Sequence, residues 1–222
     1  MKKELLMLGV LAVLYAGCGR SVTVEERVTQ YGASVQTRLA PIFATNGIAY
    51  PPPSITLIGL KAEKKLELYA RAADGSQKLI KTYPILAASG TAGPKLKEGD
   101  KQVPEGFYRI ESLNPNSRFH LSLRVNYPNV EDKQRAAKEG RTNLGGDIMI
   151  HGNSVSIGCL AMGDPAAEEL FVLAAKTGLS KIDVLLCPAD FRAKPNFQPP
   201  ASAPDWTTEL YSRLKTKLAE FK

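Results

Sequence analysis

The chain contains one pair of residues whose types and spacing suit acyl transfer through sulfur. His151 ends an alternating apolar segment and is followed by a glycine, and Cys159 comes eight residues later, directly after another glycine. A thiol attacks as its thiolate, and a cysteine with an ordinary pKa of about 8.5 needs a nearby base or positive field to form one at neutral pH. The chain has only 2 histidines, so few side chains could be that base. We therefore interpret Cys159 as a nucleophile and His151 as its base.

Other polar residues could assist this pair, although each also has an ordinary structural interpretation. His120 stands in an alternating run that could lead to the same cleft, or its ring could simply face solvent. Ser156 could contact a substrate or the base, or it could hydrogen-bond its own turn. Three arginines could pair with peptide carboxylates, or they could be solvated surface charges: Arg118, Arg124 and Arg141.

Two of the cysteines, Cys159 and Cys187, have different expected environments. Cys187 ends an apolar run that begins at Ile182, which indicates a buried strand thiol, whereas the glycine beside Cys159 indicates an exposed turn. The two thiols could pair in an oxidising compartment. Their different expected environments favour two free thiols instead.

The first residues have the order of an export signal. A basic start precedes an apolar run that ends at Ala16 and is too short for a stable membrane span. Small residues then lead to Cys18 in an order that resembles a bacterial lipobox, with Tyr15 where that pattern usually has leucine. We expect residues 1–17 to be a signal peptide, and Cys18 to anchor the exported protein in the periplasm or cell envelope through a lipid. Ordinary signal cleavage is the alternative.

Composition restricts the partners. The chain has 222 residues and a formal net charge of +7, which could attract an acidic polymer or a membrane surface. The lysines are scattered and aromatic residues make up only 7% of the chain, so we expect no nucleic-acid partner. About 200 mature residues suffice for one domain with a good core.

The predicted elements are mainly β with a few peripheral helices, an α+β pattern. Apolar residues at intervals of three and four predict a helix over 23–43. We interpret the surrounding segment, residues 18–53, as an arm that lifts the domain off its anchor. Strand and turn patterns dominate from residue 54 to about 124. A charged segment, 131–146, suits a surface loop or a short helix that could cover a groove.

The C-terminal third alternates helix and strand. Asp164 as a cap and Pro165 in the first turn predict a helix that ends at Gly178. This capping position explains Asp164 better than a role in acid–base chemistry, which Asp147 also invites. A strand (182–187), a proline-rich connection and an amphipathic helix (205–221) follow.

Three segments together resemble the catalytic domain of YkuD-type L,D-transpeptidases. The first is His151-Gly152 leading to the turn from Ser156 to Leu160. The second, residues 93–110, looks like the family's "G…GD…TPEG-x-Y-x-I" segment, and the third, residues 114–123, looks like the YafK branch in particular. The interval between His and Cys is shorter than in most of the family, and Ala161 stands where an arginine often follows; the YafK-like branch resembles this chain in both respects.

The resemblance implies a β-sandwich-like core and a cysteine that attacks an acyl donor in peptidoglycan. Cys159 would form a thioester, His151 would carry the proton, and the carbonyl of Gly152 would hold the imidazole tautomer. The backbone N–H groups of Ile157, Gly158 and Cys159 would bind the oxyanion. Residues that could contact substrate are Ser156, His120, Arg118 and Arg141. No metal or organic cofactor is needed.

We therefore predict an exported cell-wall enzyme that performs L,D-transpeptidation on peptidoglycan stem peptides. Its catalytic domain would span residues 54–190, and residues 191–222 would form a proline-rich connection and a C-terminal helix. Attack by water in place of an amine would make it a hydrolase that releases a peptide or a wall-linked lipoprotein. A non-catalytic peptidoglycan-binding lipoprotein is the third interpretation, which the intact Cys/His pair disfavours.

Overall fold

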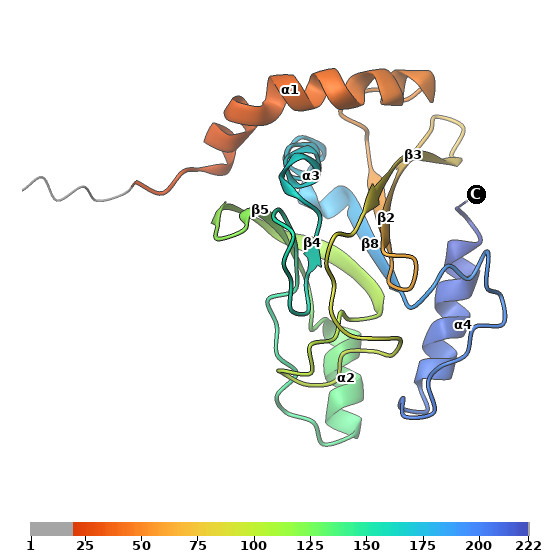
Figure 1. Cartoon of the computed structure of the whole chain (residues 1–222). Coiled ribbons are helices and arrows are strands. Elements are labelled where there is room, and N and C mark those ends of the chain that lie inside the picture. Colours follow the sequence, from red (N-terminus) through yellow and green to blue (C-terminus); the bar gives the residue numbers. More distant parts are fainter. Residues whose placement is uncertain (1–19, 222) are drawn as a thin grey trace, which may run out of the picture.

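The computed structural model describes residues 20–221, in which an eight-stranded sheet carries helices on both faces (Figure 1). The predicted signal peptide and Cys18 lie outside the described residues. In chain order the elements are α1 (Val24–Thr45), β1 (Ile55–Leu60), β2 (Lys65–Arg71), β3 (Gln77–Pro84), β4 (Gly106–Ser117), β5 (His120–Val125), α2 (Val130–Lys138), β6 (Met149–His151), β7 (Leu160–Ala161), α3 (Asp164–Thr177), the 3-10 helix η1 (Leu179–Lys181), β8 (Ile182–Cys187) and α4 (Thr207–Leu218).

The strands lie in the order β3-β2-β1-β8-β4-β5-β6-β7. β1 runs parallel to β8 and β6 runs parallel to β7, whereas the other neighbours are antiparallel. The long strand β4 joins the two halves, because residues 106–109 pair with β8 and residues from Ile110 onward pair with β5. The short strands β6 and β7 therefore form one edge of the sheet, and this edge carries His151 and the turn before β7.

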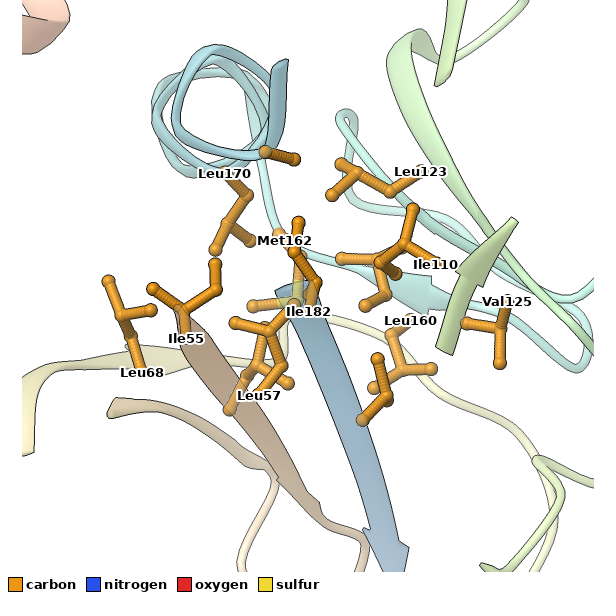
Figure 2. Packing of buried hydrophobic residues seen from close by; sticks show 14 of the residues in the cluster. Ile55, Leu57, Leu68, Ile110, Leu123, Val125, Leu160, Met162, Leu170 and Ile182 are labelled. Carbon is orange, nitrogen blue, oxygen red and sulfur yellow. The ribbon is translucent and has the colours of Figure 1, made fainter. Parts of the chain in front are cut away.

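Strands β1 and β8 are buried on both faces, which explains their nearly continuous apolar sequences. On one face Leu57 and Val184 belong to the main core, which α3 covers. On the other face Ile58 and Leu185 belong to a second cluster, which α4 covers. Figure 2 shows the main core beneath α3, with Ile55, Leu57 and Ile182 pointing toward it from the central strands.

The predicted arm is part of this core, so its interpretation as a spacer is wrong. Val35, Leu39 and Phe43 of α1 are fully buried, and α1 lies across α3 (Figure 1). Arg38 of α1 also pairs with Glu169 of α3, with 2.7 Å between Nε and Oε1. The spacing of apolar residues located the helix correctly, but periodicity does not say which surface covers an apolar stripe.

The C-terminal helix is tied to the loop that precedes β4. The hydroxyl of Tyr211 on α4 donates to Oε2 of Glu105 at 2.8 Å, and Oε1 of Glu105 accepts from Nζ of Lys61 at 2.8 Å. Both charged side chains are buried, and burial lowers the pKa of Lys61 while Glu105 opposes that change. Because an unpaired charge here would be expensive, these three residues hold α4, β1 and the loop in one arrangement.

The mixed sheet with peripheral helices confirms the fold class predicted from the sequence. The predicted charged cover, residues 131–146, includes all of α2 except its first residue, and this helix begins with a capping box between Asn129 and Asp132. Within residues 20–221, no helix combines the length and the apolar character needed to cross a membrane.

Candidate active site

The pairing of β6 with β7 brings the predicted base and nucleophile to one edge of the sheet. In this parallel pair Ile150 lies opposite Leu160 and His151 lies opposite Ala161, so Cys159 precedes β7 on the side of Met149. Leu160 points into the main core (Figure 2), and Ile150 is fully buried there as well. Because side chains alternate along a strand, His151 and Cys159 both face away from the core.

His151 is held in one orientation by a backbone carbonyl. Its Nδ1 lies 2.6 Å from the carbonyl oxygen of Gly152. A carbonyl can only accept a hydrogen bond, so Nδ1 carries the proton and Nε2 carries the free electron pair. Burial lowers the pKa of His151, and the bond to Gly152 opposes this change only in part. The ring of Phe119 covers the imidazole, with 4.7 Å between the ring centroids.

The thiol of Cys159 rests against a backbone carbonyl. Sγ lies 3.4 Å from O of Asp147 and accepts from the N–H of Met149 at 3.4 Å. Burial raises the pKa of Cys159, so the sulfur is a neutral thiol at neutral pH. In this conformation the thiol donates to O of Asp147 and makes no hydrogen bond to His151.

The turn before β7 is held by two serine hydroxyls. Oγ of Ser156 accepts from the N–H of Cys159 at 3.0 Å and donates to O of Cys159 at 2.7 Å. Oγ of Ser89 accepts from the N–H of Gly158 at 2.7 Å. Two of the three predicted oxyanion donors are thus occupied by hydroxyl oxygens in this structure. Ser156 therefore bonds its own turn, the structural alternative that the sequence left open.

Sequence reasoning missed Ser89, which lies far from the turn in the chain. An antiparallel bridge between Ala87 and Ala161 carries the segment after β3 along β7 and places Ser89 beside Gly158. The hydroxyl of Ser89 also donates to O of Lys101 at 2.7 Å. No local pattern in the sequence signals this pairing, because it depends on a tertiary contact between distant segments.

Backbone strain is concentrated around this turn. The described chain has five non-glycine residues with positive φ, and four of them lie on segments that contact the site: Lys101, His120, Asp147 and Asn153. Each such residue typically costs about 1–3 kcal/mol and persists only where the surrounding structure fixes it. Asp164, at the start of α3, helps to fix the loop after His151, because its Oδ1 accepts from the N–H of Asn153 at 2.7 Å. Asp164 does not cap α3, whose N-cap is Gly163 without a side-chain bond, so that prediction is wrong.

The tip of the β4–β5 hairpin packs closely against Gly152, the residue after His151. Gly152 has room only for hydrogen, because a Cβ there would lie 2.8 Å from O of Phe119 and 2.5 Å from Oδ1 of Asp164. His120 anchors this tip: its Nε2 lies 3.1 Å from Oε1 of Glu168, and its ring packs edge-on against Tyr31. The structure therefore engages His120 in a structural contact.

The three arginines differ in how far they are engaged. Arg124 pairs with Asp147, with 2.9 Å between Nη1 and Oδ1. Arg141 pairs with Glu139 and donates to O of Leu96 at 2.8 Å. Arg118 is exposed at the hairpin tip beside Phe119 and makes no ion pair with any of residues 20–221. Of the three, Arg118 is thus the guanidinium left free to meet a ligand.

The environments predicted for Cys187 and Cys159 can be compared with the structure. Cys187 is fully buried, and burial raises its pKa strongly. Cys159 is half-buried, not fully exposed, and both thiols are free. Two large hydrophobic residues of the turn are exposed, Val155 at 57% and Ile157 at 75%.

Comparison with known proteins gives this geometry a family. The L,D-transpeptidase catalytic domain, YkuD, matches residues 59–184. The Escherichia coli (strain K12) protein YafK, whose name assigns it L,D-transpeptidase activity only provisionally, is 38% identical over 113 residues, which are 50% of this chain and 43% of YafK. The chain thus spans less than half the length of this curated relative.

Solved structures show more distant similarity. The helical cell shape determining protein Pgp2 from Campylobacter jejuni is 19% identical with a TM-score of 0.48, over 76% of this chain and 70% of that one. L,D-transpeptidase 1 from Mycobacterium tuberculosis is 14% identical with a TM-score of 0.35, over 60% of this chain and 62% of that one. The domain match covers more than half of the chain and includes His151, Cys159 and the strands that position them, so the chain belongs to the YkuD family of L,D-transpeptidase catalytic domains.

Proposed function

We propose that the protein catalyses cysteine-dependent acyl transfer on peptidoglycan stem peptides through a thioester on Cys159, which is L,D-transpeptidation. The observation that carries this proposal is the contact between Nδ1 of His151 and O of Gly152 at 2.6 Å. It leaves Nε2 free to accept a proton, and strand pairing puts His151 and Cys159 on the same face of the sheet edge. Membership of the YkuD family supports the substrate class.

The first half-reaction transfers the acyl group to sulfur. Nε2 of His151 takes the thiol proton while Sγ forms a bond to the carbonyl carbon that follows the L-centre of the third stem residue. The tetrahedral oxyanion collapses, the bond to the nitrogen of the D-residue breaks, and the imidazolium returns its proton to that leaving amine. In the second half-reaction an acceptor amine attacks the thioester carbonyl carbon and passes a proton to His151. The carbon–sulfur bond then breaks, and the imidazolium returns that proton to the departing sulfur of Cys159.

The oxyanion would be bound by backbone N–H groups of the turn. The N–H of Ile157 has no hydrogen-bond partner within residues 20–221, whereas those of Gly158 and Cys159 are bonded to Ser89 and Ser156. The incoming oxygen would therefore take over at least one bond that a serine hydroxyl makes in this structure. Such preorganised donors stabilise charge that develops during the reaction.

Hydrolysis is the competing outcome at the same site. Water in place of the acceptor amine would release the acyl group as a free peptide or as a wall-linked lipoprotein. The exposure of Val155 and Ile157 beside Cys159 supports access of water to the thioester. The non-catalytic alternative, a peptidoglycan-binding lipoprotein, would need neither an oriented base nor a thiol beside it.

We also propose an envelope location. Residues 1–17 would direct export, and Cys18 would carry a lipid that holds the protein at a membrane. This part of the proposal rests on the order of basic, apolar and small residues before Cys18. Peptidoglycan stem peptides would then be within reach of the anchored enzyme.

Intact-mass measurement tests the chemistry directly. The protein is mixed with a stem tetrapeptide or a carbapenem, and we expect an adduct that disappears in Cys159→Ala and persists in Cys187→Ala. Digestion of treated sacculi then separates the outcomes, because new cross-links indicate transpeptidation and released peptides indicate hydrolysis. Binding to sacculi without any adduct or product would support the non-catalytic alternative and contradict the enzyme.

A further inference from the structure

One peptide group connects the carboxylate of Asp164 to the imidazole of His151. It is the peptide between Gly152 and Asn153, whose N–H donates to Oδ1 of Asp164 at 2.7 Å. Its carbonyl oxygen, which belongs to Gly152, lies 2.6 Å from Nδ1 of His151. This peptide bond is trans and planar, so its N–H and C=O point in opposite directions. The acid that fixes the N–H therefore also fixes the direction of the carbonyl that holds the base.

The backbone conformation of Asn153 opposes the observed orientation of this peptide. Its φ is 62°, in the left-handed region that is costly for residues other than glycine. Turning the peptide over would return φ of Asn153 to negative values and would point the Gly152 carbonyl away from His151. Asparagine tolerates positive φ better than most residues do, but the orientation still needs a contact that holds it. The hydrogen bond to Asp164 is such a contact.

Backbone pairing fixes the rest of the loop after His151 but not this peptide. The carbonyls of His151 and Asn153 accept from the N–H groups of Met162 and Gly163 at 2.8 and 2.9 Å, which aligns the loop with the start of α3. Within residues 20–221 the N–H of Asn153 bonds only to the side chain of Asp164. A side chain, and not a backbone partner, therefore determines the orientation of this peptide.

The β4–β5 hairpin limits the space around Gly152. A Cβ there would lie 2.8 Å from O of Phe119 and 3.0 Å from Cβ of His120. His120 is itself held by Glu168 of α3, with 3.1 Å between Nε2 and Oε1. Asp164 and Glu168 are four residues apart and lie on the same face of α3. The beginning of this helix therefore holds Gly152 from two sides, through the loop and through the hairpin.

The charge of Asp164 also affects the carbonyl. A peptide N–H that donates to a carboxylate polarises its own C=O, because hydrogen bonds in a chain strengthen one another. The oxygen of Gly152 thus becomes a better acceptor for the Nδ1–H of His151. Asp164 is exposed, so the high dielectric constant of water weakens this effect, and the orientation of the peptide matters more than the charge.

We propose that Asp164 is a positioning residue for His151, which it holds through the Gly152–Asn153 peptide with Nδ1 protonated and Nε2 free. Asp164 acts through this peptide and needs no contact with the substrate. The expected effect on rate rests on the proposed function. The tautomer of His151 can be measured without any substrate, so the positioning role is testable independently of that function.

Nitrogen magnetic resonance of isotope-labelled histidine reports the tautomer directly. The chain has only 2 histidines, so the signals that remain in a His120→Gln protein belong to His151. Above neutral pH we expect native His151 in the Nδ1–H form alone, and both tautomers in Asp164→Ala. Asp164→Asn should keep the native tautomer, because its amide oxygen still accepts from Asn153. Asp183→Ala, at an exposed position of β8, is the control.

Acylation by stem tetrapeptide, followed by intact mass, shows the effect on rate. The maximal acylation rate of Asp164→Ala should fall by about tenfold, since the base loses its alignment, and the peptide concentration at half-maximal rate should not change. Asp164→Asn should keep most of the rate. Adding Asn153→Gly to Asp164→Ala should restore part of it, because glycine has no preference for negative φ. Asp164 is exposed, so we expect each variant to remain folded, which circular dichroism checks.

The two measurements distinguish the positioning role from the proposed function. A native tautomer in Asp164→Ala would overturn the positioning role, whether the acylation rate stays native or falls without relief by Asn153→Gly. A mixed tautomer in Asp164→Ala, with a native tautomer in Asp164→Asn, would support it. The same tautomer result without any acylation of the native protein would support the positioning role and overturn the proposed function.

Discussion

Gly158 donates its backbone N–H to the hydroxyl of Ser89 at 2.7 Å, across a sequence separation of 69 residues. The same hydroxyl donates to O of Lys101 at 2.7 Å, so one serine connects the nucleophile turn to the loop before β4. The bridge between Ala87 and Ala161 fixes the alignment of the two segments. The amide next to Cys159 is thus oriented by a residue outside its own turn.

Replacing this serine should slow chemistry without weakening binding. In Ser89→Ala the Gly158 amide loses its partner, and a hydrogen bond of this kind contributes about 1 kcal/mol, so we expect acylation by tetrapeptide to fall by about fivefold. Tetrapeptide affinity of the Cys159→Ala form should be unchanged, and Ser154→Ala in the exposed part of the turn is the control. Faster acylation of Ser89→Ala would show that the hydroxyl blocks the amide instead of positioning it.

The resting site should behave as a neutral pair. Burial raises the pKa of Cys159 and lowers that of His151, so at neutral pH the thiol keeps its proton and the imidazole has none. Alkylation by iodoacetamide, followed by mass, should therefore rise with pH beyond the ordinary range of a thiol. An inflection below neutral pH would instead reveal a thiolate–imidazolium pair and contradict this assignment.

His151→Ala should separate simple alkylation from acylation by peptide. Because the thiol rests against Asp147 and not against the imidazole, iodoacetamide should react with this variant about as fast as with the native protein. Acylation by tetrapeptide should fall by about 10²–10⁴-fold, since general base catalysis is lost. A parallel loss in both reactions would mean that His151 already activates the thiol in the free enzyme.

The helix α1 should contribute to global stability. Leu39 is fully buried against the main core, so Leu39→Ala should lower the free energy of unfolding by about 2–5 kcal/mol. Gln36→Ala, on the exposed side of the same helix, should change it little. Urea denaturation followed by circular dichroism gives both values. A Leu39→Ala protein as stable as the native one would show that α1 does not stabilise the core and would support its interpretation as an arm.

Asp132 should make stability depend on acidity. Burial raises the pKa of this carboxyl to about 6, so the native state binds the proton more tightly than the unfolded chain does. This group's contribution is fully present below the unfolded pKa of about 3.9 and is lost as pH rises through about 6. Asp132→Asn should remove that part of the slope, which denaturation at pH 4 and pH 7 would reveal. An unchanged slope would show that the carboxyl titrates normally.

Local sequence was sufficient to predict the elements that carry the candidate site residues. The alternation before His151, the glycines around the turn and the apolar run to Cys187 each report on residues that are neighbours in the chain. The same holds for the helix that begins near Asp164, although its carboxylate bonds Asn153 and does not cap the helix.

Tertiary contacts were not predictable in the same way. Ser89 meets Gly158, Phe119 stacks on His151, and Arg124 pairs with Asp147, and each contact joins segments that no periodicity connects. The role of His120 was open for the same reason, because its partner Glu168 comes from α3. Sequence patterns show which face of an element is apolar, but the fold decides what lies against that face.

The covering of β1 and β8 on both faces determines which fragment of the chain can be produced separately or fused to another protein. A fragment trimmed to the family match, residues 59–184, would leave out both α1 and α4. Tyr69 and the buried pair of Lys61 and Glu105 would then lose the layer that shields them. The smallest fragment that keeps both faces of the sheet covered therefore extends from α1 through the last turn of α4. Shorter fragments in chimaeric proteins would expose hydrophobic strand faces and aggregate.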